Sequence, residues 1–73
     1  MATGYEIIAV DEDGNQTIDP YVYREQVDAK GDVLELGRAN PHLSYLVSPR
    51  DFDEERLHDK PRFHDVRRYR RGR

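Results

Sequence analysis

Arginine side chains are concentrated in the last seven residues of this 73-residue chain, where five of the seven residues are arginine. A guanidinium group can pair in a bidentate way with a phosphate or with a carboxylate. Aromatic rings between the arginines can stack on unpaired bases, which suits RNA or single-stranded DNA. The residues expected to contact a partner through this chemistry are Arg62, Arg67, Arg68, Tyr69, Arg70, Arg71 and Arg73, with Phe63 as a further candidate interface aromatic.

Two kinds of partner fit this arginine-rich arm, residues 61–73. If the arm neutralises about five phosphates, the logarithm of the binding constant falls with the logarithm of salt concentration at a slope of about −4 to −5. The same arginines can instead dock on an acidic protein surface, either on their own fold or on a neighbouring subunit. A solvated arm without a partner is the third interpretation.

Two His-Asp steps have residue types found in metal sites and in phosphohydrolases. They are His58-Asp59 and His64-Asp65, and Pro61 lies between them. Proline breaks a helix, so the two steps are not expected to share one helical face. We interpret them as parts of a charged linker and predict no metal site.

The segment from Asp11 to Asn15 has oxygen-bearing side chains at alternate positions, as the start of a calcium loop does. Gly14 comes too early for that loop, however, and Val22 stands where the loop needs a glutamate. Asp13-Gly14 is instead a strong hairpin signal, because both residues tolerate the backbone of a tight turn. We therefore predict a solvated hairpin turn.

No serine or acidic residue has a spacing from His42 that indicates a catalytic triad. Ser44 and Ser48 are interpreted as structural residues. A catalytic site also needs supporting residues that a core of this size can hardly supply. The sequence therefore predicts a protein that is not an enzyme and that binds no cofactor.

Four tyrosines fall in the first 47 residues, and two of them, Tyr21 and Tyr23, share one face of an expected strand. Tyrosine buries a large area while it keeps a polar hydroxyl. The pair can cap the edge of the core or form a binding face, and the sequence leaves both alternatives open. Tyr21 and Tyr23 are therefore candidate interface aromatics.

Charge and hydrophobicity divide the chain near Val47. The net charge is −3, but residues 1–47 carry nine acidic and three basic side chains, whereas residues 48–73 carry six acidic and nine basic ones. Twelve of the sixteen Val, Ile, Leu and Phe residues also lie in the first segment. The chain is long enough for one domain, and without cysteine it has no disulfide to stabilise it. The sequence predicts an acidic folded unit (1–47), a short charged helix (48–60) and a basic arm (61–73).

Alternating and β-branched residues predict strands at 5–10, 17–24, 33–36 and 43–47, with a turn at 29–32. Ser48 and Pro49 have the residue types of a helix start, so a helix is expected from Ser48 to about Asp59. The expected fold is β-rich α+β: a small antiparallel sheet or open SH3-like barrel of about four strands, with one short C-terminal helix and an extended basic tail.

The first residues lack the basic and apolar regions of a signal peptide, and the longest apolar run is Ile7–Val10, far shorter than a membrane span. We expect a protein that is cytoplasmic or within an intracellularly assembled particle, is not secreted by a signal peptide and has no membrane partner.

Three functional hypotheses follow from these observations. The first is a non-enzymatic accessory or structural subunit that docks on a larger protein assembly, such as a virion or multi-subunit complex, or on copies of itself, through its sheet and its C-terminal arm. The alternative is a small nucleic-acid-binding protein that contacts phosphates through the arm. The third is a small acidic inhibitor or regulator that covers a basic target site with residues such as Asp11, Glu12 and Asp13.

Overall fold

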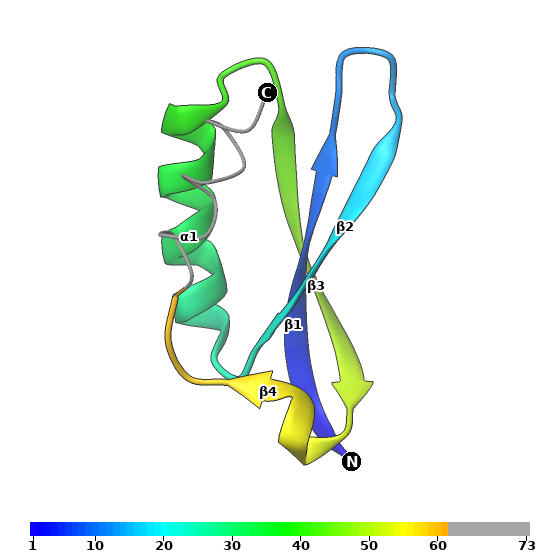
Figure 1. The fold of residues 1–73 in the computed structure, drawn as a ribbon, viewed down its shortest axis with the longest axis vertical. Coiled ribbons are helices and arrows are strands. Elements are labelled where there is room, and N and C mark those ends of the chain that lie inside the picture. Colours follow the sequence, from blue (N-terminus) through cyan, green and yellow to red (C-terminus); the bar gives the residue numbers. More distant parts are fainter. Residues whose placement is uncertain (62–73) are drawn as a thin grey trace.

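A computed structural model describes residues 1–61 of the chain. Four strands, one α-helix and one 3-10 helix follow one another in this part of the chain (Figure 1). Their bounds are β1 Ala2–Val10, β2 Gln16–Tyr23, α1 Gln26–Ala39, β3 Ser44–Phe52, η1 Glu54–Arg56 and β4 Leu57–His58. None of the helices among residues 1–61 is both long enough and apolar enough to cross a membrane.

The strands form one sheet in the order β3-β1-β2-β4. β1 is therefore a central strand, paired antiparallel with β2 on one side and with β3 on the other. Because both neighbours run opposite to β1, β2 and β3 are parallel to each other, and α1 is the crossover between them. β4 adds a two-residue parallel pairing to the outer edge of β2, through Val22↔Leu57 and Tyr23↔His58.

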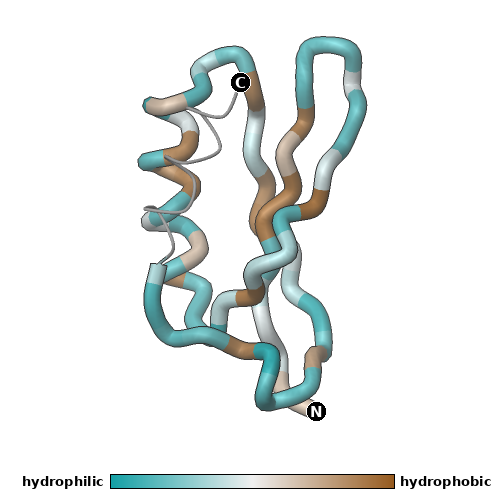
Figure 2. The backbone as a smooth tube through the Cα atoms, viewed as in Figure 1, coloured by the Kyte–Doolittle hydropathy of each residue, from teal (hydrophilic) through white to brown (hydrophobic). Residues whose placement is uncertain are grey.

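The β1–β2 hairpin forms where the sequence predicts it. The Asp11 carboxylate accepts hydrogen bonds of 2.9 Å from the backbone N–H groups of Asp13 and Asn15, and Gly14 adopts a positive φ of 87°. Glycine adopts this backbone conformation without the strain that a Cβ would bring. The segment is a hairpin turn, and its hydrophilic tip extends beyond the rest of the sheet (Figure 2).

The main core lies between the sheet and α1. Its buried residues are Ile7, Tyr23, Ala29 and Leu36, and partly buried Tyr5, Tyr21, Val33, Tyr45 and Val47 pack around them. Ala29, Val33 and Leu36 are spaced as one face of an α-helix. The core residues of the strands therefore lie on one face of the sheet, the face that α1 covers, which we call the helix-covered face.

The structure corrects the prediction for residues 29–36. The expected turn at 29–32 and the expected strand at 33–36 both lie inside α1. Gly31 favours a turn, but the i, i+4, i+7 spacing of Ala29, Val33 and Leu36 buries one helical face, and that burial outweighs the low helix propensity of one glycine.

The predicted helix from Ser48 to Asp59 is also wrong. β3 continues to Phe52, because the extended chain completes a nine-residue ladder with β1 that ends at Ala2↔Phe52. Pro49 is compatible with this strand because β3 is an edge strand, where a missing N–H costs no ladder bond if it faces outward. Helical structure in this segment is limited to the three residues of η1.

The coarse fold class is confirmed: a small four-stranded sheet with one helix, mostly strand. An SH3-like barrel is not confirmed, since β3 and β4 are the two edges of the described sheet. The division into a folded unit and an arm stays a prediction.

Candidate functional site

The face of the sheet opposite α1, the open face, carries a row of apolar side chains across three strands. Ile8 on β1 pairs with Ile18 on β2 and with Leu46 on β3. Since Ile7 and Val47 point to the helix-covered face, their neighbours Ile8 and Leu46 point the other way. Ile18 is 50% exposed and Leu46 is 53% exposed, while Ile8 is half-buried. We call these three residues the open-face row.

The other half of the open face is filled by the C-terminal part of the described chain. Val22, Phe52 and Leu57 converge over Gly4, the third residue of β1. A Cβ added at Gly4 would overlap Leu57 Cδ2 and would lie 2.9 Å from Phe52 Cδ2. Residue 4 must therefore be small for β4 and the end of β3 to pack here. The open-face row lies beyond this cluster.

An ion pair separates the two halves of the open face. Glu6 lies between Gly4 and Ile8 on this face, is 4% exposed, and has its Oε2 atom 3.1 Å from Arg50 Nε. Within the described residues this oxygen makes no hydrogen bond of good geometry. The guanidinium of Arg50 is thus the group that compensates the buried charge, because an anion removed from water is costly without a cation beside it.

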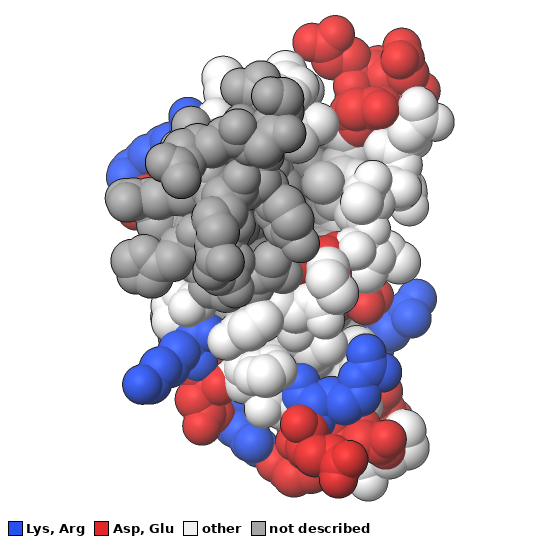
Figure 3. Space-filling view, viewed as in Figure 1, with Lys and Arg blue, Asp and Glu red and all other residues white. Residues whose placement is uncertain are grey.

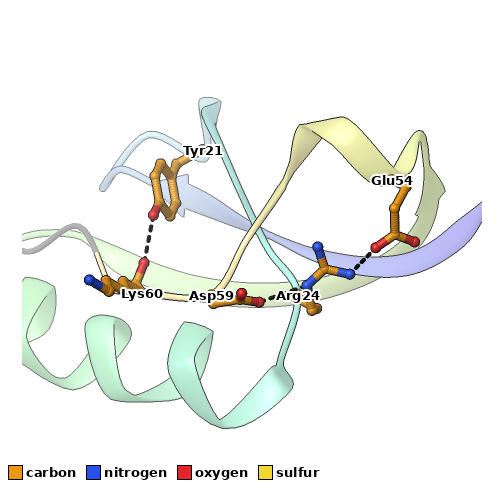
Figure 4. A network of polar contacts seen from close by, with 5 residues as sticks. All are labelled: Tyr21, Arg24, Glu54, Asp59 and Lys60. Atoms are coloured by element: carbon orange, nitrogen blue, oxygen red, sulfur yellow. Dashed lines mark hydrogen bonds and ion pairs between the residues drawn. The ribbon is translucent and has the colours of Figure 1, made fainter.

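Polar contacts hold β4 against the end of β2 (Figure 4). The Arg24 side chain pairs with Glu54, and its Nε lies 2.6 Å from an Asp59 carboxylate oxygen. The backbone N–H of Arg24 donates to the carbonyl oxygen of His58 at 2.7 Å. Its hydrogen bonds to Glu54 first, and then to Asp59, raise the pKa of Arg24 above its ordinary value. We call this set of contacts the β4 clamp.

Tyr21 and Tyr23 both lie on the helix-covered face, but their surroundings differ. Tyr23 is fully buried, and its hydroxyl donates to the Asp32 carboxylate on α1. Tyr21 is half-buried; its ring stacks on His58 at 4.4 Å between centroids, and its hydroxyl donates to the carbonyl of Lys60 at 2.6 Å. Of the two candidate interface aromatics in the described chain, Tyr23 is a core residue and Tyr21 is partly exposed.

The remaining predicted contact residues lie outside the described residues. They are Arg62, Phe63, Arg67, Arg68, Tyr69, Arg70, Arg71 and Arg73. The second His-Asp step, His64-Asp65, also lies there. In the first step, His58 stacks on Tyr21 and Asp59 pairs with Arg24. Residues 1–61 contain no group of three or more side chains placed to hold a metal ion.

Acidic residues are concentrated at the tip of the β1–β2 hairpin, which Figure 3 shows at the end of the molecule away from β4. Asp11, Glu12 and Asp13 form this tip. Hydrogen bonds to the Asp11 carboxylate, first from the backbone of Asn15, lower its pKa below the ordinary 3.8. Asp11 thus keeps its negative charge at a lower pH than an ordinary aspartate does.

Sequence reasoning missed both the open-face row and the β4 clamp. Tyr45 and Val47 alternate with Ser44 and Leu46 along this strand, but a single apolar residue among polar ones does not indicate an apolar face. The face to which it belongs follows only from the position of α1 and from the strand register. The sequence does contain one signal of this face. Ile7 and Ile8 are adjacent in a strand, so their side chains point to opposite faces of the sheet, and both faces must carry an apolar residue there.

Comparison with known proteins adds no relative. No protein-family model matches the chain, no curated protein matches it significantly, and no solved structure does so either.

Proposed function

We propose that this chain is a non-enzymatic accessory subunit that docks on a larger protein assembly through the open face of its sheet. The observation that carries the proposal is the open-face row, in which Ile8, Ile18 and Leu46 lie side by side on the face opposite α1. Exposed apolar side chains scattered singly are ordinary on protein surfaces, whereas a contiguous group marks a contact site.

The surroundings of the row support a protein partner. Ser44 and Gln16 pair with Val10 at one end of the row, and Ser48 pairs with Glu6 at the other end. An apolar centre with a polar border is the usual anatomy of a protein interface. Burial of the row would stabilise the complex by about 25 cal/mol for each Å² of apolar surface removed from water.

The charge of the described chain also favours a protein over a nucleic acid as the partner of this face. Residues 1–61 carry fourteen acidic side chains and six basic ones. A surface with this excess of negative charge repels the phosphate backbone. The nucleic-acid hypothesis therefore depends on the arm alone and stays a prediction.

The proposal is tested with a full-length double variant, Ile18→Thr plus Leu46→Thr, which keeps strand propensity while it removes apolar contact area. The matched control is Val27→Gln plus Leu34→Gln, because these residues of α1 are 72% and 66% exposed. Tagged proteins are recovered from native lysate after nuclease treatment, and bound proteins are quantified by mass spectrometry. Thermal unfolding followed by circular dichroism verifies that each variant is folded.

We expect the sheet variant to lose at least tenfold of the bound partner and the helix control to keep it. The proposal is contradicted if both variants retain the partner equally, or if nuclease removes everything that binds to the wild-type chain.

A further inference from the structure

We propose that the chain forms a symmetric dimer in which β3 of one copy pairs antiparallel with β3 of a second copy, with Leu46 opposite Leu46. The inference does not rest on the function proposed above, because it concerns an edge of the sheet rather than its open face. It starts from the outer side of β3 and from the residues that lie along it.

β3 is an edge strand whose outer side has no partner strand among residues 1–61. Apart from the ladder with β1, the backbone of Ser44–Phe52 makes no hydrogen bond within this part of the chain. The other edge of the sheet is protected, because Pro20 lacks an N–H and β4 covers Val22 and Tyr23. Strand edges without such protection pair with other chains. The outer side of β3 is therefore the edge of the described sheet to which a strand can be added.

The pairing of the sheet determines which residues of β3 point outward. The N–H of Arg24 donates to His58 in β4, away from β1, so the backbone groups of the preceding residue, Tyr23, point toward β1. Tyr23 pairs with Tyr5, whose backbone groups therefore face β2 and not β3. Pro49 lies opposite Tyr5 in β3, so its backbone groups point outward. A missing N–H breaks no ladder bond in that position.

Outward-facing backbone groups recur at every second residue, so they belong to Tyr45, Val47 and Pro49, of which Pro49 has no N–H to donate. A symmetric antiparallel pairing centred on Leu46 places Tyr45 of each copy opposite Val47 of the other. Each of these pairs then exchanges ladder hydrogen bonds in both directions, so each outward N–H has an acceptor. At the centre, the two Leu46 residues form the closer, non-hydrogen-bonded type of pair.

Neighbouring registers are less favourable. If the pairing were centred on Val47, Tyr45 would lie opposite Pro49, which cannot donate to it. If it were centred on Tyr45, it would need the N–H of Leu43, which already donates to the carbonyl of Asn40 at 3.0 Å. The backbone therefore selects the register described above.

The side chains of residues 44–48 also fit a second copy of this segment. The pairs of the register are Ser44–Ser48, Tyr45–Val47 and Leu46–Leu46. None of these residues is charged, and pairs of aromatic with β-branched residues stabilise antiparallel strands. Leu46 is 53% exposed and belongs to the open-face row. Pairing through Leu46 thus joins the open-face rows of two copies into one continuous row.

α1 supplies a second contact between the copies. A ladder of this length alone buries less than the roughly 1,200 Å² of total surface that stable complexes bury. The symmetry keeps both copies of α1 on the same side of the joined sheet, and α1 lies over β3 and β1 more than over β2. Strands are about 4.8 Å apart, so helices centred between β3 and β1 would lie about 10 Å from each other. Packed helices have interaxial distances of about 8–10 Å.

Leu34 is the residue of α1 that is placed for this contact. It is 66% exposed, and it follows Asp32 by two residues, about 200° around the helix. Asp32 contacts Tyr23 on β2, so Leu34 lies on the flank of α1 that is turned away from β2. Leu34 is about 7.5 Å before the end of α1 along its axis, and Leu46 is about 7 Å beyond the start of β3. Both leucines therefore lie near the two-fold axis of the proposed dimer.

The test uses the purified full-length chain, whose self-association is measured by sedimentation equilibrium at concentrations up to the millimolar range. We expect a monomer–dimer equilibrium that persists in one molar salt, because residues 44–48 carry no charge. Leu46→Lys and Leu46→Glu are each expected to weaken dimerization at least tenfold, since each places like charges opposite each other. An equimolar mixture of the two variants at low salt is expected to restore it, because lysine then lies opposite glutamate.

Ile18→Lys is the matched control, because Ile18 is similarly exposed on the open face but lies on β2, away from the outer side of β3. It is expected to leave dimerization unchanged. Circular dichroism verifies that each variant is folded.

A cysteine variant gives a second measurement, which is specific because the chain contains no cysteine. A non-hydrogen-bonded pair brings two Cα atoms to about 4.5 Å, within the range of about 4.4–6.8 Å that disulfides bridge. Leu46→Cys is therefore expected to link two chains under mild oxidation. Ser44→Cys is the control, because residue 44 lies opposite residue 48 of the second copy and not opposite itself.

The inference is overturned if the wild-type chain stays monomeric at millimolar concentration, if the mixed charge variants do not associate, or if Ser44→Cys cross-links as readily as Leu46→Cys. It is also overturned if Ile18→Lys or high salt abolishes association, since these results indicate contact through the open face or through charged groups. No other protein is present in these measurements, and the dimer leaves both open faces uncovered. Their outcome is therefore separate from the recovery of an assembly partner.

Discussion

Gly4 lies where the first strand meets the C-terminal part of the described chain. β1 can accept Phe52 and Leu57 near its start because residue 4 has no side chain. Core interiors are close-packed, so even one additional methyl group is felt. A single glycine in the first strand thus determines whether the C-terminal part of the described chain can pack on the open face.

We predict that Gly4→Ala destabilises the fold by about 1–3 kcal/mol, the usual cost of overpacking. Gly31→Ala is the control: a Cβ there meets nothing within 4 Å, and alanine favours the helix. Urea denaturation measures both. A Gly4→Ala variant as stable as the wild type would contradict the packing described here.

Asp11 makes a second prediction at this scale. Its folded pKa is lowered, mainly by the backbone of Asn15, so its charged form stabilises the turn above the ordinary pKa of 3.8. That contribution is lost as the pH falls through the lowered folded value. We expect the stability difference between the wild type and Asp11→Asn to be largest near neutral pH and to shrink below about pH 4. A difference that is independent of pH, measured by thermal unfolding, would refute this role.

The elements differ in how far the sequence determines them. The hairpin is predictable because Asp-Gly and the flanking alternation act locally. The helix at 26–39 was missed because Gly31 and Gly37 lower helix propensity, and its amphipathic face involves few large residues. The end of β3 was missed because Ser48-Pro49 favours a helix start, whereas the residues that pair with this segment are more than forty positions away, at Ala2–Glu6. Long-range pairing of this kind leaves no local signal.

The β4 clamp gives a prediction for an element. Arg24→Gln removes the pairs with Glu54 and Asp59, and we expect faster hydrogen exchange at the amide of Arg24, which donates to His58. The amide of Ile7, in the central strand, is expected to be unchanged, because local opening does not require global unfolding. Arg38→Gln, which removes the pair with Glu35, serves as the control. If the amide of residue 24 exchanges at the same rate in the wild type and in Arg24→Gln, the side-chain pairs of the β4 clamp are not what holds β4 against β2.

At the scale of the molecule, the two faces of the sheet differ in what covers them. The helix-covered face carries the main core, between the sheet and α1. The open face carries the row proposed for an assembly. The open-face row was beyond sequence reasoning, because its position depends on which face of the sheet α1 covers.

The central position of β1 also has a consequence for the order of folding. β1 is the first strand of the described chain, yet its full pairing requires Phe52, fifty positions later. During synthesis, β1 and β2 can form a hairpin early, but one edge of β1 stays unpaired until β3 has emerged. Such non-local closure is slow, and an open edge invites association with other chains. The nascent protein is therefore exposed to misassembly from the formation of the hairpin until β3 has emerged.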